Sequence, residues 1–116
     1  MNKKSFINNV KSFVRDAAVE DTYENAIAPP GKTPTEIEKS IANWVNSLSS
    51  EEKDYIQHLI KAATDETLFG LLCVIDGVRT VTEEDGNFVL QFKTDTTSFL
   101  LNDSKDEYLH DIFNEK

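Results

Sequence analysis

The residues best suited to covalent chemistry are one cysteine and two histidines, Cys73, His58 and His110. A cysteine nucleophile needs a partly exposed thiolate in an electropositive setting, with a histidine base within reach. Cys73 instead lies between Leu72 and Val74 in an apolar run, and free cysteines are among the most buried residue types. The sequence therefore predicts a buried, unreactive thiol. Neither histidine has a partner at the spacing of a metal site, so we expect no catalytic residue, no metal and no cofactor.

Carboxylates are the second group that could do chemistry, and they gather in two places, before Gly86 and around the last expected helix. These acids are Glu83, Glu84, Asp85, Asp103, Asp106, Glu107 and Asp111. Acid pairs can transfer protons or hold calcium, but a calcium loop needs a glutamate six residues after its glycine, where this chain has Phe92. The acids near the last helix are also those that a helix dipole attracts to its N-terminus.

Charge is unevenly distributed along the 116 residues. Twelve Lys and Arg against 21 Asp and Glu give a formal net charge of -9. The first 15 residues carry Lys3, Lys4, Lys11 and Arg15 and no acid, which leaves eight bases and 21 acids, a net charge of -13, to residues 16–116. Such a surface repels nucleic acid and anionic membranes, so neither is an expected partner. A lone thiol and an apolar run, residues 68–75, too short to span a bilayer indicate a cytoplasmic protein.

Apolar residues at three- and four-residue spacing predict helices over 4–20 and 36–48, separated by a long connection over 21–35 that contains three prolines. Ile7 and Phe13 are expected on the same apolar face of the first helix, and Thr35 is expected to cap the second. The expected buried stripe of the second helix is Ile37, Ile41, Trp44, Val45 and Leu48. Ser49 and Glu52 form a capping box that opens a third helix over 50–63, paired with the second in a tight hairpin. Residues 66–76 predict a buried fourth helix ending at Gly77, with a buried strand over 71–75 as the alternative.

Beyond Gly77 the apolar period changes to two. This alternation predicts a two- to three-stranded antiparallel meander over 78–101, with Glu83, Glu84 and Asp85 at the tip of its first hairpin and its last strand at 97–101. Residues 102–104 are expected to cap a C-terminal helix over 104–114. The order of elements predicts an α+β fold in a single domain, residues 1–116.

A small acidic domain without catalytic groups is expected to act by binding another protein. Acids tune the rate of association, whereas an aromatic anchor such as Tyr23, on the long connection, supplies affinity. The expected partner-binding residues are Tyr23, Glu83, Glu84, Asp85, Asp103, Asp106, Glu107 and Asp111. The chain is expected to be a monomer or a homodimer, because an amphipathic stripe can face its own chain or a second copy.

Several segments of the second half, LFGLLCVIDGVR, FVLQF, LLND and LHDIFN, resemble small bacterial immunity-type proteins. This resemblance implies a protein without enzymatic activity that neutralises a cognate toxin, here a basic one, by capping it directly. Two alternatives remain open. One is an intracellular regulatory or adaptor module that docks a host-cell protein between the helical hairpin and the meander. The other is a small enzyme that uses Cys73 or an acid pair.

Overall fold

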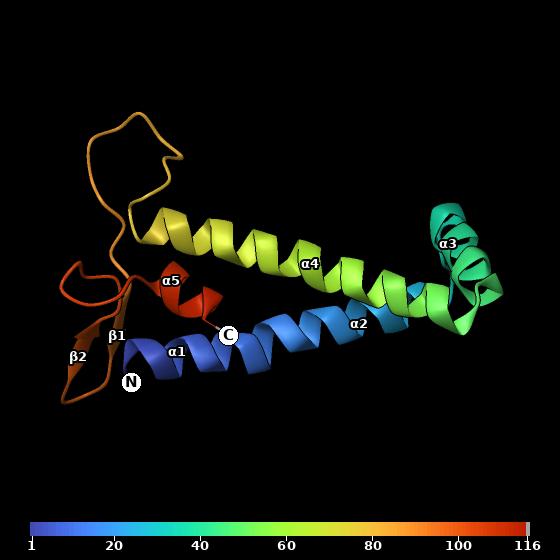
Figure 1. Ribbon diagram of the computed structural model, residues 1–116, viewed down its shortest axis with the longest axis horizontal. Helices are drawn as coiled ribbons and strands as arrows, with labels where there is room; N and C mark the ends of the chain where they lie inside the picture. The colour runs from blue at the N-terminus through green and yellow to red at the C-terminus, as the bar shows by residue number, and fades with distance from the viewer. Residues whose placement is uncertain (116) are drawn as a thin grey trace.

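The computed structural model describes residues 1–115 as an elongated molecule of 50 × 32 × 29 Å (Figure 1). Two long helical segments run antiparallel to each other: α1, η1 and α2 follow one another without a break, and α4 returns alongside them. A further helix lies at each end of this pair, α3 at one and α5 at the other, and a two-stranded sheet stands near α5. The elements are α1 (Lys3–Asn9), η1 (Val10–Arg15), α2 (Asp16–Ile27), α3 (Glu36–Ser47), α4 (Ser50–Ile75), β1 (Gln91–Lys93), β2 (Ser98–Leu100) and α5 (Leu109–Asn114). The fold is therefore α+β and mostly helical.

The first helical segment is longer than the sequence predicted. It continues to Ile27 instead of ending near residue 20, so Tyr23 lies on α2 and not on a connection. No glycine or proline interrupts residues 16–27, and the helix ends where Pro29 constrains the residue before it. The amide of Ala28 still donates a hydrogen bond of 2.9 Å to the carbonyl of Glu24.

A π-helical stretch, η1, changes which side of this segment faces the core. The predicted apolar stripe assumed one uninterrupted α-helix, but a π turn contains more residues than an α turn and rotates the side chains that follow it. Ile7 is fully buried, whereas Phe13, expected on the same face, is 76% exposed. The stripe is thus split between a buried beginning and an exposed continuation.

Two predicted helices, 50–63 and 66–76, are one helix, α4. Thr64 and Thr67 were expected near a break, but their hydroxyls donate hydrogen bonds of 2.8 Å to the carbonyls of Ile60 and Ala63, one turn back. This arrangement lets a threonine stay inside a helix. The strand alternative for residues 71–75 is wrong, and the expected cap at Gly77 is confirmed by its φ of 80°.

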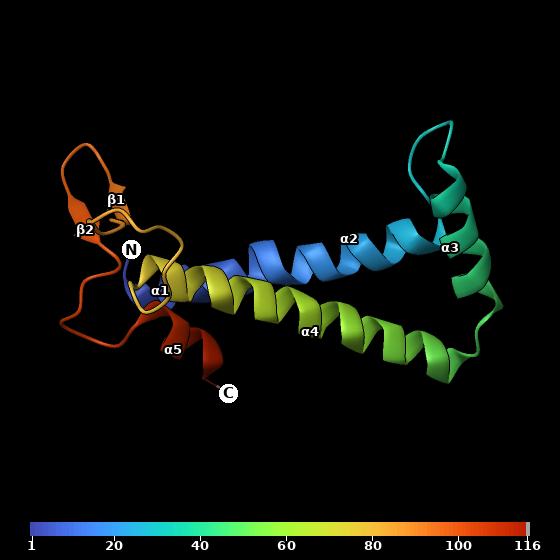
Figure 2. The same ribbon diagram turned by 90° about the horizontal axis from the view of Figure 1, so that it is seen from above.

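The capping boxes at Thr35 and Ser49 are present, so α3 and α4 begin where the sequence predicted. The expected tight hairpin between them is wrong, because α3 packs against α2 and stands steeply to α4 (Figure 2). As a result α3 buries Ala42 and Val45 but leaves much of its predicted stripe exposed. Ile37 is 66% exposed, and Ile41 and Trp44 are also exposed.

The hydrophobic core lies at one end of the molecule, where α5 wedges between α1 and α4 (Figure 1). Its buried members are Ile7, Leu72, Leu109, Ile112 and Phe113. They come from all three helices, so six residues of α5 complete a core that α1 and α4 do not close alone.

The predicted meander is only partly present. β1 and β2 pair antiparallel, with Phe92 opposite Phe99, as expected for the last two strands. The first expected strand is missing, and residues 76–90 form a loop instead of an acidic-tipped hairpin. Where that strand was expected to begin, the amides of Val78 and Arg79 instead donate to the carbonyl of Cys73 at 2.9 and 3.2 Å, so they close the end of α4 and are not free for a strand ladder. The other end of the loop is held by Asn102, whose side chain accepts from the Leu90 amide at 2.8 Å and donates to the carbonyls of Ile75 and Phe88 at 2.7 Å.

The C-terminal helix begins at Leu109, with Tyr108 as its N-cap residue, and not at residue 104. Asn102 is used by the neighbouring loop as described, and Asp103 contacts Lys3. Residues 102–104 therefore do not cap a helix.

Candidate functional site

The predicted partner-binding residues do not form one surface. Asp103, Asp106 and Glu107 line one cavity at the α5 end of the molecule. Glu83, Glu84 and Asp85 lie in the loop of residues 76–90, which projects away from the helices in Figure 1. Asp111 lies on α5 beside His110, and Tyr23 lies in a separate groove between α2 and α4. The structure thus divides the predicted site into several surfaces.

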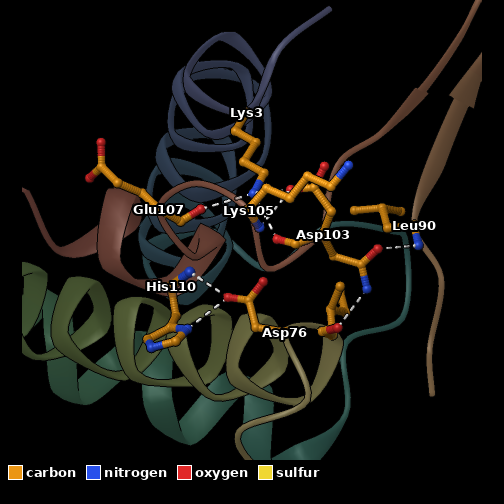
Figure 3. Close-up of polar contacts among 9 residues, drawn as sticks. Lys3, Asp76, Leu90, Asp103, Lys105, Glu107 and His110 are labelled. Carbon is orange, nitrogen blue, oxygen red and sulfur yellow. Dashed lines mark hydrogen bonds and ion pairs between the residues drawn. The ribbon is translucent and has the colours of Figure 1, made fainter. Parts of the chain in front are cut away.

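The α5-end cavity, of about 420 Å³, lies between the start of α1, β2 and the segment that precedes α5. Its acids do not stand alone. The Lys3 ammonium contacts the Asp103 carboxylate at 2.9 Å and donates to the carbonyls of Asp103 and Glu107 at 2.9 and 3.0 Å (Figure 3). The hydrogen bond from Lys3 lowers the pKa of Asp103. With Lys4 4.0 Å from Glu107, the cavity presents mixed charge and not a purely acidic face.

Glu107 and Glu115 form an acid pair at the rim of this cavity. A hydrogen bond with the Glu115 carboxyl, and then its negative charge, raises the pKa of Glu107. Two carboxyls that share a site disfavour double ionisation, so one of them holds its proton to a higher pH than an isolated glutamate does. The Glu107 side chain is half exposed, so solvent weakens this coupling.

Asp76 and His110 form the most buried polar contact of the described chain, and the sequence analysis missed it. The Asp76 side chain is 1% exposed. Its Oδ2 accepts from the His110 backbone amide at 2.9 Å and lies 2.7 Å from His110 Nδ1 (Figure 3). The imidazole also stacks on Tyr108, with 5.3 Å between ring centroids, and meets the edge of Phe69.

A carboxylate that orients an imidazole is also found in hydrolases, where the other ring nitrogen faces a nucleophile. In this chain His110 Nε2 lies 3.4 Å from the Asp111 carboxylate, and His110 is absent from the lining of the α5-end cavity. Asp76 instead joins the end of α4 to the first turn of α5. The sequence signal for it was an aspartate placed directly between a buried apolar run and Gly77.

The groove that holds Tyr23 is the more acidic of the two sites. It has a volume of about 420 Å³ and is lined on the α2 side by Asp16, Glu20 and Glu24. These carboxylates follow one another at four-residue steps, so they form a row along one face of α2. Tyr23 was predicted to bind a partner, but this row was not predicted, because the first helix was expected to end near residue 20 and Tyr23 and Glu24 were therefore not placed on one helix with Asp16 and Glu20.

The remaining chemical candidates occupy no comparable site. Cys73 is buried and free, as expected from its apolar neighbours. Within residues 1–115 there is no group of three or more His, Cys, Asp or Glu side chains arranged to hold a metal ion. No helix in the same range combines the length and apolar character needed to cross a bilayer.

Comparisons of the chain with protein-family models, curated proteins and solved structures found no match. The function is therefore inferred from the surfaces of the molecule itself.

Proposed function

We propose that this chain is a protein-binding protein of the immunity type, which neutralises a basic toxin domain by direct complex formation. The observation that supports the proposal is the groove between α2 and α4, where Tyr23 lies beside the carboxylates of Asp16, Glu20 and Glu24. We call this surface the acidic groove. Its chemistry complements a surface rich in Lys and Arg, such as one that binds phosphates.

The acidic groove contains the two components of a specific interface. Tyrosine is enriched among residues that dominate binding energy, because it offers a large, rigid ring and a polar hydroxyl. The carboxylate row repeats about every 6 Å along α2, the rise of four helical residues, and offers regularly spaced acceptors to basic side chains. Asp16 is paired with Arg15, whose Nε lies 2.7 Å from its Oδ1, and Lys61 also lines the groove. Glu20 and Glu24 are then the acids of the row that are left to meet a basic partner, and the groove keeps a net negative charge.

The loop acids Glu83, Glu84 and Asp85 have a different proposed role. All three are exposed, and none is in an ion pair among residues 1–115. Charges at the periphery of an interface mainly change the association rate and its dependence on salt. We therefore assign the loop to the first encounter with the partner and the acidic groove to the bound complex.

The test is co-expression with the product of the adjacent reading frame, followed by calorimetry of the purified pair. The chain is expected to restore the growth of cells that make the neighbouring protein and to bind it with one chain per toxin domain. The double variant Glu20→Lys/Glu24→Lys and the single variant Tyr23→Ala are expected to abolish rescue. The triple variant Glu83→Lys/Glu84→Lys/Asp85→Lys serves as the matched charge-reversal control and is expected to slow association while leaving the dissociation rate unchanged.

Three results would contradict the proposal. The first is that the neighbouring protein is not toxic, and the second is that it is toxic but unaffected by the chain. The third is that the acidic-groove variants rescue growth as well as the wild-type chain does. Circular dichroism of each variant separates loss of binding from loss of folding.

A second candidate function is an adaptor that docks a segment of a regulatory protein in the α5-end cavity. The supporting observation is that this cavity lies between the helices and the β-hairpin and combines Lys4 and Asp106 with the apolar side chains of Phe99 and Leu100. The two candidates predict opposite results from the same variants. An adaptor loses its partner with Phe99→Asp and keeps it with Glu20→Lys/Glu24→Lys, whereas an immunity-type protein does the reverse.

A further inference from the structure

The middle of the molecule consists of two helices with no third element against them. Between α5 at one end and α3 at the other, α2 and α4 contact only each other, as both ribbon views show (Figures 1 and 2). A pair of helices has two broad faces, and in this stretch both are uncovered. One face carries the acidic groove, and the other has a different chemistry.

The opposite face carries a groove without ionised side chains. It has a volume of about 310 Å³ and is lined by Val14, Ala18, Ala63, Thr64, Thr67 and Leu68. Val14 and Ala18 are each two residues from an acid of the acidic groove, a rotation of about 200° around a helix, so the two grooves lie on opposite sides of α2. We call this second surface the apolar groove.

An exposed ridge runs beside the apolar groove along α4. Tyr55, Leu59, Ala63, Thr67 and Leu71 recur at four-residue steps, all five are exposed, and none carries a charge. Leu59 is 69% exposed. Rows of residues spaced by four are those that interlock when two helices pack, and this row extends over about 24 Å. This one surface therefore carries both a ridge and a groove, and a ridge on one molecule can fit a groove on another.

The chain as a whole exposes more area than a compact monomer of its mass does. The chain exposes 8411 Å², whereas a compact monomer of 13.1 kDa exposes about 6,400 Å². Its radius of gyration is 18.3 Å, against about 13 Å for a compact chain of this length. The excess of about 2,000 Å² exceeds the roughly 800 Å² that each partner contributes to a standard stable interface.

Charge decides which occupant suits the face. A basic partner is attracted to acids, and none lines the apolar groove. Two copies of a chain with a net charge of -9 repel each other overall, and a contact made of uncharged side chains adds no further repulsion. A two-fold dimer also requires a self-complementary surface, which a ridge beside a groove provides.

We propose that two copies of the chain form a symmetric dimer in which the α4 ridge of each copy packs into the apolar groove of the other. The two helix pairs then form a four-helix bundle around an apolar centre. Both acidic grooves remain on the outside of this bundle, so dimerisation does not depend on the proposed toxin-binding function and does not compete with it.

Analytical ultracentrifugation of the full chain tests this dimer, with Leu59→Glu as the disrupting variant and Ile37→Glu as its matched control. Both substitutions place a glutamate at an aliphatic position of similar exposure, one on the ridge and the other on α3. The wild-type chain and Ile37→Glu are expected to sediment with twice the mass of the chain. Leu59→Glu is expected to weaken association by at least about 100-fold, because each interface then contains two buried charges.

Each remaining outcome overturns the proposal. These outcomes are a wild-type chain that sediments as a monomer at about 100 μM, a Leu59→Glu variant that remains dimeric, and an Ile37→Glu variant that dissociates as readily as Leu59→Glu does. The last result would place the dimer contact on α3. Because Leu59 is exposed in the single chain, its substitution leaves the fold of the monomer intact, which circular dichroism at low concentration verifies.

Discussion

The two halves of α4 lie in different surroundings. Its C-terminal half packs with α1 and α5 around Leu72, Leu109 and Phe113, a region we call the closed end. Its N-terminal half, together with η1, α2 and α3, forms what we call the open part, where large apolar side chains such as Phe13 and Leu59 face solvent. The same continuous helix thus supports a packed core at one end and an unfilled surface at the other.

The connection between the helices also differs between the two regions. In the open part Arg15 reaches across from η1 to Asp65 of α4 at 3.2 Å, and Asp65 is also 3.8 Å from Lys61. At the closed end the helices meet through fully buried Ile7 and Leu109. Partly exposed ion pairs contribute little to stability compared with buried apolar side chains. We infer that the closed end stabilises the monomer and that the open part is available for partners.

Truncation of one large side chain in each region gives the largest contrast. Leu109→Ala removes a fully buried side chain from the core and is expected to lower the free energy of unfolding by about 3 kcal/mol. Ile37→Ala truncates an exposed side chain of the open part and is expected to change it by less than about 0.5 kcal/mol. Urea unfolding of both variants at one protein concentration measures the difference. Equal losses would mean that the two regions are equally packed.

A smaller loss of stability is expected from the contact between Asp76 and His110, which joins α4 to α5 within the closed end and which we call the joint. Asp76→Ala removes the acceptor of both the backbone amide and the ring nitrogen of His110, and we expect a loss of about 2 kcal/mol. The loss is moderate because Asp76 Oδ1 is buried without a hydrogen-bond partner, so the native carboxylate is itself incompletely satisfied.

The matched control for the joint is Asp111→Ala, which removes the exposed carboxylate on the other side of the same imidazole. Its expected effect is within about 0.5 kcal/mol. Thermal unfolding of the two variants compares the two contacts of one histidine. If Asp111→Ala costs as much as Asp76→Ala, the buried carboxylate is not what fixes α5.

Local signals in the sequence predicted where several elements begin and end. The cap at Thr35, the capping box at Ser49 and the glycine at position 77 act over three or four residues, and all of them are found in the structure. The spacing of apolar residues along the chain likewise predicted the broad α+β class and the pairing of the last two strands.

Features that depend on distant residues were not predictable by the same reasoning. A helical period shows which residues share a face but not which face a neighbour covers, so the stripes containing Phe13 and Trp44 were expected to be buried. Asp76 meets His110 across 34 residues, and Lys3 meets Asp103 across 100. The acidic groove was missed for a local reason, because Tyr23 was assigned to a connection and its flanking acids were not recognised as a helical row.

The smallest expected effect is at the rim of the closed end, where Asp103 and Glu107 are expected to change the stability of the chain in opposite directions as pH rises. The pKa of Asp103 is lowered by its hydrogen bond with Lys3, so this carboxylate stabilises the folded chain above its unfolded pKa, and the contribution is lost as pH falls below about 4. The pKa of Glu107 is raised by Glu115, so its contribution has the opposite sign. It is present below the unfolded pKa of about 4.3 and lost as pH rises through the folded value.

Conservative amide variants separate these two contributions. Relative to the wild-type chain, Asp103→Asn is expected to be less stable at pH 7 and to reach parity as pH falls below about 4. Glu107→Gln is expected to gain stability relative to the wild-type chain as pH rises above about 4, because it removes the repulsion with Glu115. Urea unfolding between about pH 3 and 7 measures both series. Slopes of the same sign would contradict the opposite effects of Lys3 on Asp103 and of Glu115 on Glu107.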